Sequence, residues 1–216
     1  MRKTLFVIFL ACAASIHAAE STEIRQLSKK AYTQEIQKNA VVVFDVSWGR
    51  KWGCGEFENA ELMQIEFDRL PIIKNDSEKS DLVIEGPSRL FRTPNFLNYG
   101  FILPPEEYAL SGVNIKVARS VSDVGRFITK RSDLIKDGKP EGGSFTVAAG
   151  EIVYIGNFFL DCQTGPILWR YYSAGKEGFE KQMGEYKRKY PFIDLERAKF
   201  RLFKSKYFGT DYNLPE

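Results

Sequence analysis

The sequence predicts a mainly β fold, an antiparallel β-sandwich with a C-terminal helix packed on it. Short segments rich in β-branched and aromatic residues alternate with turns that contain glycine, proline or asparagine, a pattern typical of antiparallel sandwiches. One segment near the C-terminus instead has apolar residues at helical spacing. The 216 residues, 44% of them hydrophobic, suffice for one domain with its own core. We expect residues 40–216 to form this single domain.

The first 18 residues have the pattern of a secretory signal peptide. A basic start precedes an apolar stretch, and small residues lead up to Ala18. The stretch is too short to span a membrane, and no later segment approaches that length. We therefore expect cleavage after Ala18, a mature chain in the periplasm or cell envelope, and no transmembrane segment. Lipidation of Cys12, which ends the lipoprotein-like sequence FLAC, is the alternative.

Removing residues 1–18 nearly neutralises the chain. Arg2 and Lys3 are lost, so Lys plus Arg falls from 31 to 29, against 28 Asp plus Glu. This balance does not indicate nucleic-acid binding, and the expected partner is an unknown envelope component or a glycan. His17, the only histidine, also lies in the signal peptide. Serine or cysteine catalysis with a histidine base is thereby excluded, as are histidine-bearing zinc sites, and no cofactor is expected.

Cys54 and Cys162 are the two cysteines that remain after processing at Ala18. In an oxidising compartment such a pair usually joins. Cys162 also follows Asp161, whose negative charge disfavours a reactive thiolate. We predict a Cys54–Cys162 disulfide, with two free buried thiols as the alternative.

The first elements follow from composition. Residues 19–39 are polar with weak helical spacing, which predicts a flexible or partly helical lead-in. Residues 40–48 (AVVVFDVSW), residues 60–70, which alternate in polarity, and the SDLVIEG segment are predicted strands. The glycine-rich segment between the first two strands is expected to be a loop or a loose hairpin.

Two later segments share one order of residue types. FILPPEEYALSGV (101–113) and FTVAAGEIVYIGNF (145–158) each predict a strand, a tight corner and a strand. The two prolines belong at a corner because they cannot donate to a ladder. Gly150 permits a turn geometry that Glu106 would have to adopt in the first copy.

These paired segments resemble a group of uncharacterised exported bacterial envelope proteins, small β-sandwiches that carry PPGxY and AGEVVYIG strand pairs. The likeness covers residues 96–165, with Glu106 where the group usually has glycine. The resemblance implies an envelope location and a sandwich, and it carries over no catalytic residue.

The C-terminal part predicts the helix. Phe179, Met183, Tyr186 and Tyr190 lie on one helical face, which ends before Pro191. We expect this face to dock on the sandwich. The segment AKFRLFKSKYF (198–208) is predicted to be a basic edge strand rather than a further helical turn. We interpret the basic residues of this region as solvated faces and as protection against edge pairing; they are Lys187, Arg188, Lys189, Arg197, Lys199, Arg201, Lys204 and Lys206.

Two pairs of residues are candidates for a site. Trp48 and Trp52 flank two cations and are the possible ligand-stacking pair for a sugar ring; alternatively, one indole packs against the disulfide and the other covers the core. Glu56 and Asp161 lie near the predicted disulfide and are the only carboxylates we single out. We expect a non-enzymatic binding or structural module of the envelope, without catalytic or metal residues. The alternative is a carboxylate-dependent enzyme that acts on envelope glycan.

Overall fold

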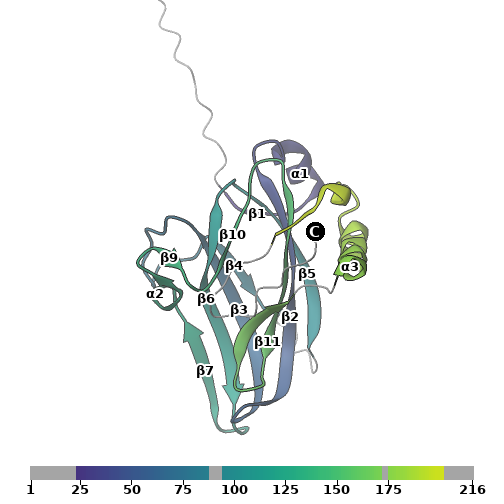
Figure 1. Cartoon of the computed structure of the whole chain (residues 1–216). Coiled ribbons are helices and arrows are strands. Elements are labelled where there is room, and N and C mark those ends of the chain that lie inside the picture. Colours follow the sequence, from purple (N-terminus) through teal and green to yellow (C-terminus); the bar gives the residue numbers. More distant parts are fainter. Residues whose placement is uncertain (1–22, 88–93, 172–174, 202–216) are drawn as a thin grey trace, which may run out of the picture.

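A computed structural model describes residues 23–87, 94–171 and 175–201 of the chain (Figure 1). The predicted signal peptide, the cleavage after Ala18 and the lipidation of Cys12 lie outside the described residues. None of the helices in the described ranges is long and apolar enough to cross a membrane.

The fold is mainly β, as predicted, with two layers of largely antiparallel strands. The first layer consists of β1 (Arg25–Gln26), β5 (Asn95–Leu103), the first part of β2 (Ala40–Cys54) and β11 (Ile152–Asp161), beyond which lie β12 (Ile167–Tyr171) and β13 (Lys199–Phe200). The second layer consists of β4 (Leu82–Glu85), β3 (Phe57–Arg69), β6 (Glu107–Ala118), β7 (Val124–Thr129) and β10 (Ser144–Thr146). A small hairpin joins β8 (Ile135–Lys136) to β9 (Lys139–Pro140), and the helices are α1 (Lys29–Glu35), α2 (Arg131–Leu134), α3 (Gly175–Lys189) and the 3₁₀ turn η1 (Leu195–Arg197).

Strand β2 belongs to both layers. Its residues 40–48 pair with β5, and residues 49–54 pair with β3. Gly49 stands at the crossing with φ 111°, and Gly55 turns the hairpin with φ 60°, backbone values that favour glycine. The expected hairpin is present, but it is tight rather than loose, because these glycines serve a strand that changes sheets and then turns at Gly55 into β3.

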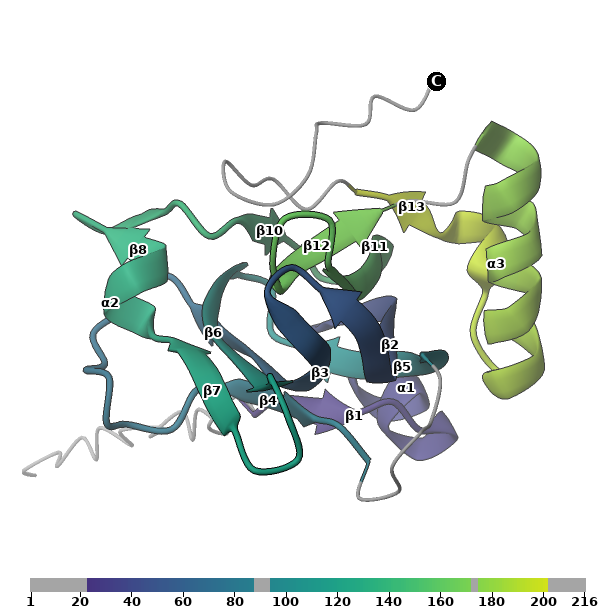
Figure 2. The same ribbon diagram turned by 90° about the horizontal axis from the view of Figure 1, so that it is seen from below.

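Successive side chains of β2 point to opposite faces of the sheet and so belong to two different hydrophobic cores. Val42, Phe44 and Val46 pack between the layers, whereas Val41 and Val43 face the helices. The predicted helix is confirmed as α3, and its docking face packs on the outer face of the first layer through Met183, Tyr186 and Tyr190. The side chain of Phe179 lies outside the described part. Viewed from below, α3 lies on one side of the molecule, and α2 with β8 on the opposite side (Figure 2).

The lead-in is more ordered than its composition predicted. Ser28 caps α1, accepting a hydrogen bond from the Ala31 amide. Leu27, just before this cap, is buried in the core beneath the helices. The lead-in thus docks on the sandwich, and the predicted partial helix is confirmed.

Both predicted corners are present, with different backbones. Gly150 has φ 78°, whereas Glu106 is not in the left-handed region, so the expected common turn geometry is wrong. The corner after Pro104 is held instead by the Tyr108 hydroxyl, which donates to the Pro104 carbonyl at 3.0 Å. The Val147 amide donates to the Glu106 carbonyl and brings the two corners together.

The basic C-terminal segment begins as the predicted strand. Its described part, β13, pairs in parallel with β11. Lys199 and Arg201 are not simply solvated, because both bind Glu151 at the second corner. Hydrogen bonds from Arg201 lower the pKa of Glu151 to about 2. Residues 202–208 lie outside the described ranges.

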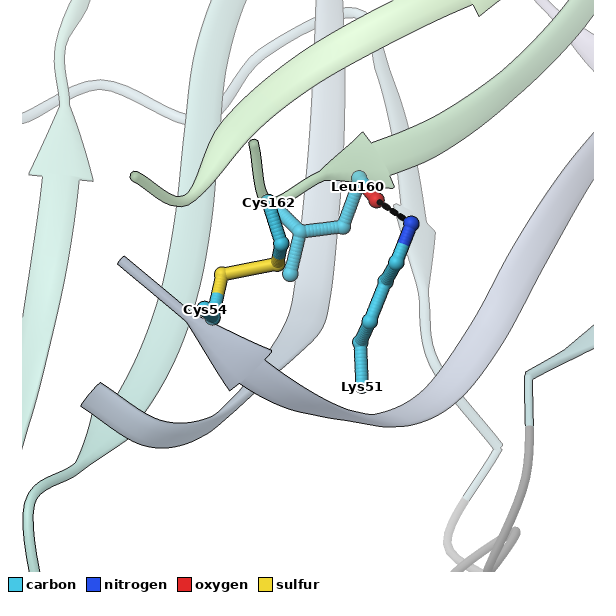
Figure 3. The surroundings of a disulfide bond; sticks show 4 residues. All are labelled: Lys51, Cys54, Leu160 and Cys162. Carbon is cyan, nitrogen blue, oxygen red and sulfur yellow. Dashed lines mark hydrogen bonds between the residues drawn. A yellow bond between two sulfur atoms is a disulfide. The ribbon is translucent and has the colours of Figure 1, made fainter. Parts of the chain in front are cut away.

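The Cys54–Cys162 disulfide is confirmed. The two Cα atoms are 4.4 Å apart and the sequence separation is 108 residues. β2 and β11 start side by side, with Val46 opposite Phe158, and then diverge as β2 crosses to the second layer. The disulfide joins their ends again, beside a hydrogen bond from the Lys51 ammonium to the Leu160 carbonyl (Figure 3).

Replacing either cysteine with serine should lower the free energy of unfolding by about 4–5 kcal/mol, the chain-entropy value for a loop of this length. The double variant should lose little more than either single variant, because all three lack the same covalent link. Urea unfolding without reductant measures these losses. Two free thiols titrating in the unfolded, non-reduced wild-type protein would contradict the assignment.

Candidate functional site

The two candidate tryptophans lie in different environments. Trp48 is 1% exposed in the core, and its indole donates to the Tyr99 hydroxyl at 2.7 Å. Trp52 is 55% exposed, and the Arg50 guanidinium lies 5.3 Å from its ring centroid. The predicted stacking pair does not form, because the crossing at Gly49 puts the two indoles on different sheets. Trp52 alone is available to a ligand.

Strand pairing places four charged residues side by side near Trp52. We name them the charged row; from β2 to β7 they are Arg50, Glu61, Lys116 and Arg126. The neighbours of Glu61 on β3, Ala60 and Leu62, are buried between the layers. Because side chains alternate along a strand, the charged row points to the outer face of the second layer.

A second row lies two residues along the same strands. Trp52, Asn59, Ala118 and Val124 are aligned in register. Val124 is 51% exposed, so the row carries apolar surface at both ends. The two rows together form a polar and aromatic face on four hydrogen-bonded strands.

This face suits an anionic ligand with flat apolar surfaces. Glu61 lies between Arg50 and Lys116, and Arg126 follows on the next strand, so the row has an excess of two positive charges. At a strand spacing of about 4.8 Å the row is roughly 14 Å long. An exposed indole beside such a row is placed to stack on a sugar ring while the cations bind carboxylate or phosphate groups.

A second polar cluster lies at one end of the second layer. The Arg131 side chain is 6% exposed, and its Nε donates to Asp68 Oδ2 at 2.8 Å. Lys74 Nζ bridges Asp68 Oδ1 at 3.2 Å and Asp81 Oδ1 at 2.7 Å. Arg131 also donates to the backbone carbonyls of residues 75 and 78. These bonds hold the segment 74–81 against β3, and we interpret the cluster as structural.

Shallow clefts flank this cluster. One of about 260 Å³ is lined by Asp68, Lys74 and the exposed Ile73, and another of about 400 Å³ extends toward Arg131. Burial alone would raise the pKa of Asp68. Hydrogen bonds from the Ser111 hydroxyl, the Asp81 amide and the two cations outweigh that effect and lower this pKa.

The candidate carboxylates do not bind each other in the described part of the chain. Glu56 accepts a hydrogen bond from Arg119 at 2.8 Å on the surface, and Asp161 ends β11 beside the disulfide. Within the described ranges no hydrogen bond joins Glu56 to Asp161. In those ranges no three His, Cys, Asp or Glu side chains are grouped as metal ligands either.

Sequence reasoning missed both the charged row and the Arg131 cluster. Arg131 and Asp68 are 63 residues apart and meet only through the fold. Arg50 and Glu61 would have been found from the hairpin alone, had its turn been recognised at Gly55. Comparisons with protein-family models, with curated proteins and with solved structures find no match.

Replacing Arg131 with methionine should lower the free energy of unfolding at pH 7 by about 3–5 kcal/mol, because Asp68 then keeps a buried charge without its buried guanidinium partner. Chemical denaturation measures the loss. Arg119→Met is the matched control, because its exposed pair with Glu56 is worth at most about 1 kcal/mol. Equal losses in the two variants would contradict the structural role of Arg131.

The pH dependence of the wild type gives a separate measurement. The pKa of Asp68 is lower in the folded protein than its ordinary value of 3.8, so its ionised form stabilises the fold above that pH. This contribution should disappear as the pH falls through 3.8 and below. Asp68→Asn should remove the corresponding part of the acid unfolding curve, and an unchanged curve would contradict the prediction.

Proposed function

We propose that this chain is an exported, non-enzymatic β-sandwich of the cell envelope that binds an anionic envelope glycan on the outer face of its second layer. The observation that carries the proposal is the exposed Trp52 beside the charged row. The buried disulfide supports export, because such bonds persist in oxidising compartments.

The chemistry of the face favours recognition by charge and stacking. The Arg50 guanidinium lies over the Trp52 indole, and the 55% exposed side chain of Trp52 offers stacking surface to a sugar. The β2–β3 pairing and the disulfide fix both side chains on a rigid hairpin, which reduces the ordering cost of binding. Part of the affinity is ionic and should fall as salt is added.

Trp52→Ala should weaken binding to soluble cell-wall fragments at least tenfold, because the stacking surface is lost. Isothermal titration calorimetry of the mature protein measures the affinity, and Trp52→Phe should retain most of it. Ile73→Ala, which truncates an exposed apolar residue outside this face, is the matched control. Fragments with amidated carboxyl groups should bind weakly to every variant. Tight binding of amidated fragments, or equal affinity of Trp52→Ala and wild type, would refute the glycan site.

The same fragments test the enzymatic alternative. Under the binding proposal the fragments stay intact during prolonged incubation, as chromatography would show. Turnover that disappears in Glu56→Gln or Asp161→Asn would establish the carboxylate-dependent enzyme instead.

Export is tested on the protein recovered from cells. Mass spectrometry should find a mature chain that starts at Ala19 in the periplasmic or envelope fraction. A diacylated Cys12 would replace this with the lipoprotein form, and a cytosolic chain with Met1 intact would contradict export.

A further inference from the structure

The outer face of the first layer contains a buried carboxyl directly beneath α3. Asp45 follows Val41 and Val43 on the side of β2 that faces the helices, and it is 2% exposed. Asn98 of β5 donates to its Oδ1 at 2.5 Å, and Gln182 of α3 donates to its Oδ2. One carboxyl thus joins two strands and the helix through neutral amide donors.

The surroundings of Asp45 offer little compensation for a negative charge. The titratable groups that face it come from α3, from the residue after α3 and from β11; they are Glu185, Tyr186, Lys189, Tyr190 and Tyr154. Lys189 is the one cation among them, and its ammonium donates to the Asn98 carbonyl. In the described part of the chain no ion pair to Asp45 is formed.

A buried hydroxyl also lies next to this carboxyl. Tyr186 on α3 lies beside Asp45. Within the described ranges its buried hydroxyl oxygen has no partner that meets both the distance and the angle of a hydrogen bond. The Tyr186 hydroxyl can donate to the ionised carboxyl, so it lowers the pKa of Asp45. This effect is smaller than the opposing effect of desolvation.

We propose that Asp45 makes α3 a pH-responsive cover of the first layer, docked while the carboxyl is protonated and loosened once it ionises. Ionisation puts an unpaired charge under the helix, and opening α3 exposes that charge to water. The same motion uncovers the apolar face that includes Val43 and Tyr154. An exported protein experiences the pH of its surroundings directly, so such a cover would respond to external pH.

The direction of the effect follows from burial. Desolvation raises the pKa of Asp45 from 3.8 to about 7, against smaller lowering contributions from Tyr186, Asn98 and Lys189. A group whose pKa is raised in the closed form binds its proton more tightly there than in water, so opening becomes easier as the pH rises from 3.8 toward 7. For those two values, opening should increase roughly a hundredfold between pH 5 and pH 9.

Hydrogen exchange tests the proposal on the full mature chain. The opening constant of the α3 amides in residues 180–189, corrected for intrinsic exchange, should rise about a hundredfold from pH 5 to pH 9. The amides of the central β3–β6 pair should change far less. Asp45→Asn should abolish the pH dependence in α3, because the amide keeps the shape and cannot ionise. An opening constant that is independent of pH in the wild type, or equally dependent in Asp45→Asn, would overturn the proposal.

Two further measurements do not require Asp45→Asn to fold. An NMR titration of the Asp45 carboxyl carbon in the wild type should show a midpoint near 7, and a midpoint below 5 would overturn the proposal. Lys189→Met removes the neighbouring cation, so it should extend the rise in α3 opening to higher pH. Glu185→Gln removes a neighbouring anion and should end the rise at lower pH, and a shift of either variant in the opposite direction would contradict the mechanism.

Discussion

The structure depends on the sharing of β2 between two sheets. A strand that pairs first with β5 and then with β3 must change direction where the first ladder ends and the second begins. Gly49 stands at that point, and its positive φ allows the change. The crossing separates β2 from β11, its parallel neighbour, and the disulfide rejoins them at Cys54 and Cys162. The core between the layers, the helix-covered face and the exposed hairpin all take their positions from this one strand.

The local features of this arrangement could be predicted from the sequence. The β-branched run at residues 40–48 and the helical spacing from Met183 to Tyr190 predicted elements that the fold contains. The disulfide prediction followed from the expected oxidising compartment and from the two cysteines left after the predicted cleavage. The glycines at 49 and 55 were misread because composition alone does not distinguish a loop from a strand that crosses between sheets. The charged row needed cross-strand register, which local patterns do not contain.

Two buried aspartates illustrate the same limit for electrostatics. Asp45 and Asp68 each lie in a β-branched or alternating strand, and nothing in their sequence neighbours separates them. The fold gives Asp68 two cations, whereas it gives Asp45 amides and a tyrosine. Burial with a cation lowers the pKa of a carboxyl, and burial among neutral groups raises it. Arg131 is 63 residues from Asp68, and Asn98 is 53 residues from Asp45, so partners distant in the sequence help to decide the chemistry of each carboxyl.

The crossing also separates the two features of β2 on which our proposals rest. Asp45 precedes Gly49 and faces α3, whereas Trp52 follows it and lies on the outer face of the second layer. Residues 49–54 are held by the β3 ladder and by the disulfide, and neither includes the helix. Loosening of α3 therefore leaves the geometry around Trp52 in place. Under the two proposals, a strand anchored at its far end lets one sheet face respond to pH while the other keeps a fixed binding surface.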